Sequence, residues 1–195
     1  MNPSHRKALR LELRAARRAL DSGARALAAR RVAEHVDRIF HLKSGQRIAL
    51  YASLPDELDT TPLIELARER GCLVYLPRIN RRTLRIHFVL AEGATRANHL
   101  GIDEPSGARS IGARWLDLVF LPLVGFDAHG MRLGMGGGYY DRTFEFLNRR
   151  TSWRAPRLIG IAYSFQRVTH IEPAPHDVRL DAVVTEEGLA YKHIS

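Results

Sequence analysis

The stretch Arg132-Leu-Gly-Met-Gly-Gly-Gly-Tyr-Tyr-Asp141 follows an apolar segment, Leu116–Phe126, and precedes apolar residues at helical spacing. Four glycines within five positions leave backbone N–H groups uncovered by side chains. A glycine-rich turn between a strand and a helix is a common anion-binding arrangement, because free N–H groups and the helix dipole point the same way. The stretch therefore predicts a strand over 116–126, an anion-binding loop, and a helix over 139–150.

This loop matches neither of the two common phosphate-binding motifs. It lacks the Gly-Lys-Ser/Thr ending of a Walker A loop, and Tyr139 stands where the dinucleotide fingerprint requires its third glycine. A flexible surface turn without a ligand is the alternative interpretation. The presence of both Arg132 and Asp141 at a strand–helix junction favours a ligand.

Strand and helix patterns alternate along the chain and predict one three-layer α/β domain over 1–195 with a mostly parallel sheet. We expect helices over 4–20, from a cap at Ser22 to about Phe40, and from Thr60 or Thr61 to Gly71; strands over 47–54, 72–79, 83–90, 158–165 and 181–185; and an irregular connection over 92–114. Ligands of such sheets lie beyond the carboxyl ends of strands. Glu57 and the glycine-rich loop both follow strands, so we expect them to share one crevice.

Positive charge is concentrated in the N-terminal helical segment, 4–40. The chain carries a net charge of +9, and residues 1–31 hold nine basic and two acidic residues. Nucleic-acid binding usually needs several phosphate contacts and often adds aromatic side chains, and this segment has none before Phe40. Two or three of these cations suffice for a compact polyphosphate, while a solvated helix face remains the alternative for most of them.

Cysteine content and hydropathy indicate a cytoplasmic location. Cys72 is the only cysteine, which excludes an internal disulfide, and its apolar surroundings in the sequence place it in the core. No apolar run approaches the roughly 20 residues that span a bilayer, and we expect no secretory signal. We therefore expect no membrane partner.

Apart from the four glycines, the candidate functional residues are mainly acidic, and their positions indicate binding of phosphate and its metal ion. There is no Gly-x-Ser-x-Gly, no His-Glu-x-x-His and no Cys-x-x-Cys, and His87 falls in a strand pattern typical of a structural histidine. Asp141 is placed either to hold Mg²⁺ beside phosphate or to satisfy a helix N-terminus. Glu57 is either a site residue or an exposed turn acid. Asp181 is either the residue before a strand or a second metal contact.

The residues from Leu121 to Asp141, Leu-Pro-Leu-Val-Gly-Phe-Asp-Ala-His-Gly-Met-Arg-Leu-Gly-Met-Gly-Gly-Gly-Tyr-Tyr-Asp, resemble the signature of the 5-formyltetrahydrofolate cyclo-ligase family, also called 5,10-methenyltetrahydrofolate synthetases. Supporting similarities run nearly end to end: Arg6-Lys-Ala-Leu-Arg10, Asp56-Glu-Leu-Asp-Thr60, Gly101-Ile-Asp-Glu-Pro105 and Asp181-Ala-Val-Val-Thr185. The resemblance implies a Rossmann-like α/β/α fold and an enzyme that uses ATP and Mg²⁺ to cyclise 5-formyltetrahydrofolate.

The resemblance also implies roles for individual residues. ATP would be bound by Arg6, Lys7, Arg10, Arg132, Gly134, Met135, Gly136, Gly137, Gly138, Tyr139 and Tyr140. The folate would be bound by Ala52, Glu57 and Tyr139, and magnesium by Asp141 and Asp181. We expect no nucleic-acid partner and a monomer.

The chain departs from the family pattern at two positions. Arg6 stands where the family often has lysine, while Lys7 lies one residue on, and on a helix that shift turns the side chain by about 100°. Either residue could therefore contact phosphate. Gly137 replaces a basic residue of some relatives, which leaves Arg132 and the N-terminal helix to supply the charge.

Two other functions remain open from the sequence. A paralogue of the same fold that phosphorylates or binds a different small molecule would keep the ATP-binding residues and have a different substrate site around Glu57. A non-enzymatic nucleic-acid or regulatory protein would use the basic helix. Folate-independent ATP consumption distinguishes the first of these, and steeply salt-dependent RNA binding the second.

Overall fold

The computed structural model describes residues 3–93, 95–97, 103–149 and 155–193. Its helices are α1 (Pro3–Ala19), α2 (Ser22–Phe40), α3 (Thr61–Glu69) and α4 (Tyr139–Phe144), with 3-10 helices η1 (Ala113–Trp115), η2 (Glu145–Arg149) and η3 (Ser164–Gln166). Its strands are β1 (Arg47–Ala49), β2 (Leu73–Asn80), β3 (Arg85–Leu90), β4 (Thr95–Ala97), β5 (Asp103–Pro105), β6 (Ser110–Ile111), β7 (Leu118–Pro122), β8 (Gly125–Phe126), β9 (Arg132–Leu133), β10 (Arg157–Ile161), β11 (Ala182–Thr185) and β12 (Gly188–Lys192).

One large sheet organises the described residues. Its eight strands follow the order β12-β11-β10-β7-β1-β2-β3-β6. The five inner strands from β11 to β2 run parallel, whereas β12, β3 and β6 pair antiparallel at the two sides. The carboxyl ends of the parallel strands therefore meet along one edge, as the sequence predicts.

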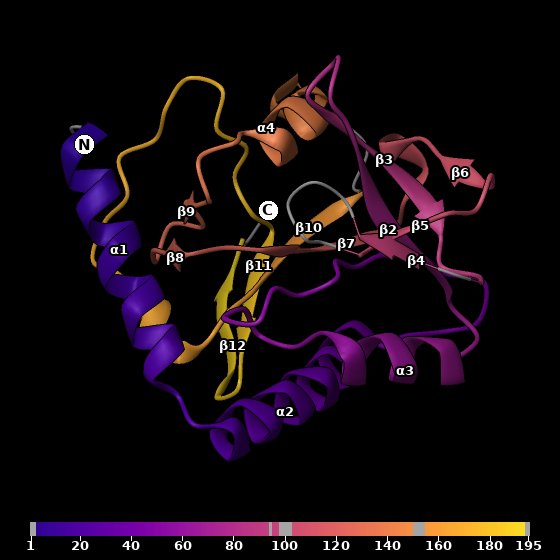
Figure 1. Cartoon of the computed structure of the whole chain (residues 1–195), viewed down its shortest axis with the longest axis horizontal. Coiled ribbons are helices and arrows are strands. Elements are labelled where there is room, and N and C mark those ends of the chain that lie inside the picture. The colour runs from indigo at the N-terminus through magenta and orange to yellow at the C-terminus, as the bar shows by residue number, and fades with distance from the viewer. Residues whose placement is uncertain (1–2, 94, 98–102, 150–154, 194–195) are drawn as a thin grey trace.

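Helices cover both faces of this sheet, which confirms the three-layer α/β/α arrangement (Figure 1). On one face, α2 and α3 bury Val32, Val36 and Leu63 against the strands. On the other, α4 and η2 bury Phe144 and Leu147. The inner strands are apolar on both sides because both of their faces are covered.

Helix α1 lies beside the β8–β9 hairpin rather than on either face of the sheet (Figure 1). Its apolar residue Leu13 packs in a small separate cluster with Val124, Met131, Leu133 and Ile171. This cluster places one long side of α1 against the segment that leads into the glycine-rich loop. The positions of the first two helices agree with the sequence prediction.

Several local expectations are wrong, because side chains and tertiary contacts decide them. The cap of α2 is Asp21, whose side chain accepts a hydrogen bond from the Ala24 N–H, and not Ser22. Thr60 occupies the N-cap position of α3, as expected, but its hydroxyl donates to the Tyr51 carbonyl and makes no capping hydrogen bond.

The predicted strand over 116–126 is divided into β7 and β8. Asp127, fully buried, follows β8 and accepts hydrogen bonds from the N–H groups of His129, Met131 and Ile171. These bonds stabilise a tight turn, and the chain folds back as β9. Sequence periodicity does not report such a turn.

Other elements are shorter or more numerous than predicted. The strand predicted over 47–54 ends at Ala49, and the helix predicted over 139–150 is the short α4 followed by η2. The connection over 92–114 contains β4, β5 and β6, and β12 was not predicted. Gly101, Ile102 and Arg150 lie outside the described residues.

Candidate active site

The carboxyl edge of the sheet brings together two segments, which we call the glycine loop (134–138) and the acid turn (53–57). The acid turn follows β1, and the glycine loop follows the β7–β9 region. Helix α1 runs past both of them and contacts each through arginine side chains. Both segments thus lie along α1, and a crevice shared by Glu57 and the loop stays a prediction.

The glycine loop is open to solvent and needs its glycines. Gly136 has φ +101° and Gly138 has φ +62°, values that residues with a Cβ rarely adopt. A Cβ on Gly137 would lie 2.7 Å from the Tyr139 ring, whereas one on Gly134 would meet nothing within 4 Å. Met135 is 46% exposed. The loop therefore presents bare backbone toward solvent.

Arg10 of α1 reaches this loop. Its Nε donates to the Gly134 carbonyl over 2.8 Å, and its Cζ would lie 3.9 Å from a Cβ on Gly136. Partial burial, together with the positive charge of Arg6, lowers the pKa of Arg10. An anion bound here would relieve the repulsion between these two arginines.

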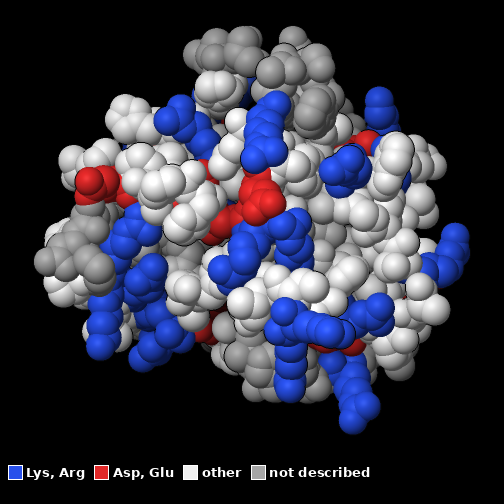
Figure 2. All heavy atoms as spheres, turned by 90° about the horizontal axis from the view of Figure 1, so that it is seen from above, with Lys and Arg blue, Asp and Glu red and all other residues white. Residues whose placement is uncertain are grey.

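Arg6 and Lys7 have different surroundings. Arg6 donates to the Glu172 carbonyl and lies 3.4 Å from an Asp177 carboxylate oxygen, so it ties α1 to the segment before β11. Lys7, one residue on, is exposed. The face viewed in Figure 2 carries many basic side chains, with a few acidic ones among them.

Arg132 and Asp141, the two charged ends of the stretch 132–141, form an ion pair. Arg132 lies 2.5 Å from Asp141 through its Nη2, donates to the Val178 carbonyl, and has a side chain only 6% exposed. The Val178 N–H also donates to Asp141 Oδ1, over 3.1 Å. Arg132 and Val178 therefore fix one oxygen of Asp141. Ligation of ATP by Arg132 stays a prediction.

Asp181 occupies the position directly before β11. Its Oδ2 accepts a hydrogen bond from the Leu158 N–H over 2.7 Å, at the amino-terminal side of the parallel strands. Within the residues that the structure describes, no three His, Cys, Asp or Glu side chains converge to hold a metal ion. Magnesium ligation by Asp141 and Asp181 stays a prediction.

The acid turn presents a buried carboxylate. Glu57 is 7% exposed, and its Oε2 accepts a hydrogen bond from the Leu54 N–H over 3.0 Å. The interpretation of Glu57 as an exposed turn acid is therefore wrong. Burial raises the pKa of the Glu57 carboxyl, while the Leu54 N–H and the charge of Arg17 act in the opposite direction. Ala52, half-buried, lies between β1 and this turn.

Tyr140 of the signature segment interacts electrostatically with Glu57 of the acid turn. Burial raises the pKa of Tyr140, and the negative charge of Glu57 raises it further. Glu57 and Tyr140, one residue predicted for the folate and one for ATP, are therefore close enough to interact electrostatically. Tyr139 packs with the Arg142 guanidinium 5.8 Å from its ring centroid. Arg142, which the sequence analysis did not identify as a site residue, therefore lies next to the glycine loop.

The sequence also missed the residues that hold the acid turn. Arg17 is 1% exposed, and its Nη2 donates to Asp56 over 2.8 Å. Arg14 lies 3.3 Å from the same Asp56 oxygen. Arg14 and Arg17 extend a stripe that begins at Arg6 and Arg10 at helical spacing, so the pattern could have been found. Only the structure shows that the stripe is buried at one end.

A cavity of about 890 Å³ lies elsewhere on the molecule. Its described lining residues come from η1, η2 and two connecting segments: Arg114, Trp115, Glu145, Phe146, Asn148, Arg149, Ala155, Pro175 and His176. None of these residues was predicted for the site. The cavity plays no part in the arrangement described above.

Sequence comparison matches residues 2–186 to the model of the 5-formyltetrahydrofolate cyclo-ligase family. The chain belongs to this family. A 5-formyltetrahydrofolate cyclo-ligase of Haemophilus influenzae is 33% identical over 92% of this chain and 97% of its own length. The Escherichia coli K12 protein of the same name is 36% identical over 71% of this chain and 76% of its own length.

Solved structures agree with membership of the cyclo-ligase family. A 5,10-methenyltetrahydrofolate synthetase of Aquifex aeolicus has a TM-score of 0.79 at 27% identity, and covers 94% of this chain and 91% of its own. That of Mycoplasma pneumoniae has a TM-score of 0.72 at 26% identity, over 93% of this chain and 98% of its own. The activity is that of a 5-formyltetrahydrofolate cyclo-ligase, an ATP-using enzyme of one-carbon metabolism.

None of the helices in the described part of the chain combines the length and the apolar character that a bilayer crossing requires.

Proposed function

We propose that the enzyme activates the formyl group of 5-formyltetrahydrofolate by phosphorylating its oxygen with ATP. The formamide carbon is a poor electrophile, and its oxygen is a poor leaving group. When the formyl oxygen takes the γ-phosphoryl group, ADP leaves and an iminium phosphate forms. N10 then attacks the carbon and loses its proton, the ring closes, and phosphate leaves with the former formyl oxygen.

In this reaction the protein positions two substrates and neutralises phosphoryl charge. It needs no protein nucleophile, which agrees with the absence of nucleophile motifs from the sequence. The glycine loop supplies backbone N–H groups to the phosphates, and Arg10 supplies positive charge at Gly134 and Gly136. Lys7, exposed one turn away, is the second cation that we assign to the phosphates.

The residues around Asp141 fit a magnesium ion. Mg²⁺ is usually held by one or two carboxylates together with substrate phosphates and water, so a cluster of three acidic side chains is not required. Arg132 and Val178 engage one oxygen of Asp141, which leaves the other to face the metal. When bound, magnesium would neutralise charge on the β- and γ-phosphates. The resemblance implies Asp181 as a second ligand, but Asp181 lies at the amino-terminal side of the parallel strands, so we assign the ion to Asp141.

The folate lies on the acid-turn side in this proposal. Glu57 accepts a hydrogen bond from the Leu54 N–H through Oε2, and we assign its Oε1 to an N–H donor of the folate. Ala52 and Tyr139 would line the same side. The observation that carries the proposal is that α1 contacts both segments: Arg10 donates to the Gly134 carbonyl of the glycine loop and Arg17 donates to Asp56, the neighbour of Glu57.

One assay tests the proposed function. Protein, 5-formyltetrahydrofolate and Mg–ATP are mixed, and the absorbance of 5,10-methenyltetrahydrofolate is followed while ADP is measured separately. We expect equal amounts of both products and no reaction without ATP. Folate-independent ADP formation would instead favour a paralogue with another acceptor.

We also propose that the enzyme acts as a monomer in the cytoplasm. The single cysteine, Cys72, is buried and free, as expected in a reducing compartment. Light scattering on purified protein should give a mass close to the 22.0 kDa of one chain. A mass twice as large would contradict the proposal.

A further inference from the structure

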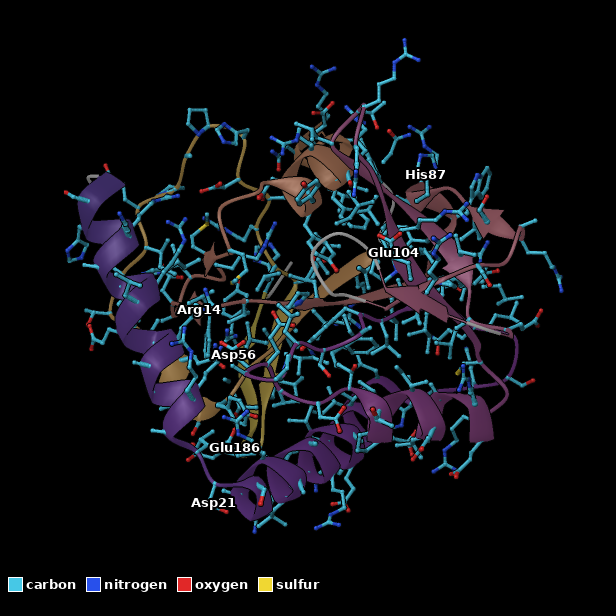
Figure 3. The ribbon with its side chains drawn as sticks, in the orientation of Figure 1. Arg14, Asp21, Asp56, His87, Glu104 and Glu186 are labelled. Carbon is cyan, nitrogen blue, oxygen red and sulfur yellow. The ribbon has the colours of Figure 1, made fainter. Side chains whose placement is uncertain are left out.

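The acid turn is held mainly by arginines from outside it. Arg14 and Arg17 of α1 both reach the Asp56 carboxylate, at 3.3 Å and 2.8 Å. Figure 3 shows Arg14 pointing from α1 toward Asp56, on the inner side of the helix. Arg25 of α2 donates to the Pro55 carbonyl. Three cations from two helices thus converge on a turn of five residues.

Arg17 differs from the other two in its burial. Its side chain is 2% exposed, whereas that of Arg14 is 31% exposed. Its Nη1 donates to the Leu123 carbonyl over 3.4 Å, in the segment after β7, and its Nε has no hydrogen-bond partner. Burying an arginine with one donor unsatisfied destabilises a fold, so stability alone does not explain its presence.

Asp56 and Glu57 are neighbours, and Arg17 acts on both. The charge of Arg17 is one of the influences that favour the ionised form of Glu57. For Asp56, burial raises the pKa, but the charge and hydrogen bond of Arg17, with those of Arg14, bring it below its ordinary value. The Tyr163 hydroxyl approaches the Glu57 carbonyl at 3.5 Å, so the backbone of the turn is held from a second side.

We propose that Arg17 is a positioning residue for the folate: through Asp56 it holds the acid turn so that the ionised Glu57 carboxylate faces the substrate. This inference rests on the proposed role of Glu57 as the folate carboxylate. Arg17 does not touch the substrate in this proposal. Its two functions are separable, because its hydrogen bonds fix the geometry of the turn and its charge favours the ionised form of Glu57.

The experiment compares three variants with the parent enzyme. Arg17→Met removes the charge and the hydrogen bonds at similar volume, Arg17→Lys keeps the charge, and Arg18→Met is the matched control at an exposed position of the same helix. KM for the folate, KM for ATP and kcat are measured, with the Kd for 5-formyltetrahydrofolate determined by calorimetry without ATP.

We expect Arg17→Met to raise both the KM and the Kd for the folate about tenfold, the effect of losing one charge-assisted hydrogen bond, with KM for ATP unchanged. Arg17→Lys should raise them about threefold, and Arg18→Met should change neither. A lowered melting temperature with unchanged folate KM would show a purely structural role and overturn the proposal. If Arg17→Met does not fold, unchanged folate KM in Arg17→Lys overturns it equally.

A pH profile separates charge from geometry. The charged and titratable groups facing Glu57 are Arg14 and Arg17 from α1, Asp56 in the turn, Tyr51 after β1, and Tyr140 in α4. Among these, only Arg17 changes in the variants. Loss of its charge should move the acidic limb of folate kcat/KM to higher pH in Arg17→Met, whereas Arg17→Lys should keep the parent limb. An unmoved limb in Arg17→Met would contradict the proposal.

A double-mutant cycle shows whether Arg17 works through Glu57. In a Glu57→Gln background, Arg17→Met should change the folate KM less than twofold. A full further tenfold rise there would overturn the proposal even if the parent enzyme cyclises the folate as expected. Failure of the proposed function is recognised separately, because the parent enzyme then forms no methenyltetrahydrofolate.

Discussion

The glycine loop and the acid turn solve the problem of binding a polar substrate in opposite ways. The glycine loop is exposed and offers backbone groups, and its conformation depends on glycines with positive φ. The acid turn is partly exposed but offers one buried side chain, Glu57, and its position depends on arginines from two helices. The first device is local in sequence and the second is tertiary. Substitutions in the two regions should therefore impair different kinetic parameters.

Gly136→Val should have the largest effect. With φ +101° at this position, a β-branched residue is strained, and its side chain would cover the backbone that we propose as a phosphate contact. We expect kcat/KM for ATP to fall by about 100-fold, equivalent to the loss of one or two charge-assisted hydrogen bonds. Steady-state kinetics with varied ATP measures the effect.

Gly134→Ala is the matched control for this change. A Cβ there would meet nothing within 4 Å, and Gly134 lacks a positive φ. We expect less than a threefold loss. Equal losses in the two variants would show that the loop is generally intolerant and that backbone contact at Gly136 is not special.

Glu57→Gln should impair the other region. Removing the charge at nearly constant shape should raise the KM for the folate about 30-fold and leave KM for ATP unchanged, the range expected for a hydrogen bond to a charged group. In the parent enzyme, kcat/KM for the folate should fall as pH drops through the raised pKa of Glu57, because the ionised form binds. The glutamine variant should lose this acidic limb.

The stability of Glu57→Gln provides an independent check. Burial raises the pKa of Glu57 in the folded protein above its unfolded value, so the ionised carboxylate destabilises the fold, and stability falls as pH rises through the raised pKa. Glutamine carries no such charge. We expect a melting temperature at pH 7 equal to or above that of the parent; a large decrease would mean that the carboxylate mainly stabilises the turn.

The contrast between the two regions also explains how much the sequence could tell. The glycine loop, the basic stripe and the parallel sheet follow from composition and periodicity, which act over a few residues. The turn between β8 and β9 is stabilised by Asp127, whose three hydrogen bonds include one from Ile171, far along the chain. Periodicity carries no information about such a partner.

The burial of Glu57 in the acid turn could not be predicted from the sequence either. Asp56-Glu-Leu-Asp has the composition of an exposed turn, and the residues that contact the acid turn, among them Arg17, Arg25 and Tyr163, are distant in the sequence. Arg132 and Asp141 lie at the two ends of the stretch 132–141. The family resemblance of this stretch could be recognised from the sequence, whereas the ion pair between the two residues could not. The sequence thus predicts residues for the site, and the structure shows that two of them, Arg132 and Asp141, form an ion pair.

Asp141→Asn tests the metal side of the glycine loop. Asparagine keeps the shape but is a weaker ligand for Mg²⁺, so we expect the Mg²⁺ concentration for half-maximal activity to rise about tenfold at saturating ATP. Loss of the partner of Arg132, whose side chain is 6% exposed, should also lower stability, by about 3 kcal/mol, because a buried charge is left unpaired. Superimposable Mg²⁺ titrations would remove Asp141 from the metal site and leave it a structural partner of Arg132.

Arg10→Ala should have the smallest effect and sharpens the comparison most directly, because Arg10 belongs to α1 yet serves the glycine loop. Its Nε contacts the Gly134 carbonyl, and an anion bound at Gly136 would lie beside its guanidinium. Since Arg10 is partly exposed, solvent screens its charge, and we expect KM for ATP to rise about fivefold with folate KM unchanged. Arg18→Ala, at an exposed position on the same helix, should change neither. The opposite result, a rise confined to the folate KM, would mean that the whole of α1 serves the acid turn and that the loop binds phosphate by its backbone alone.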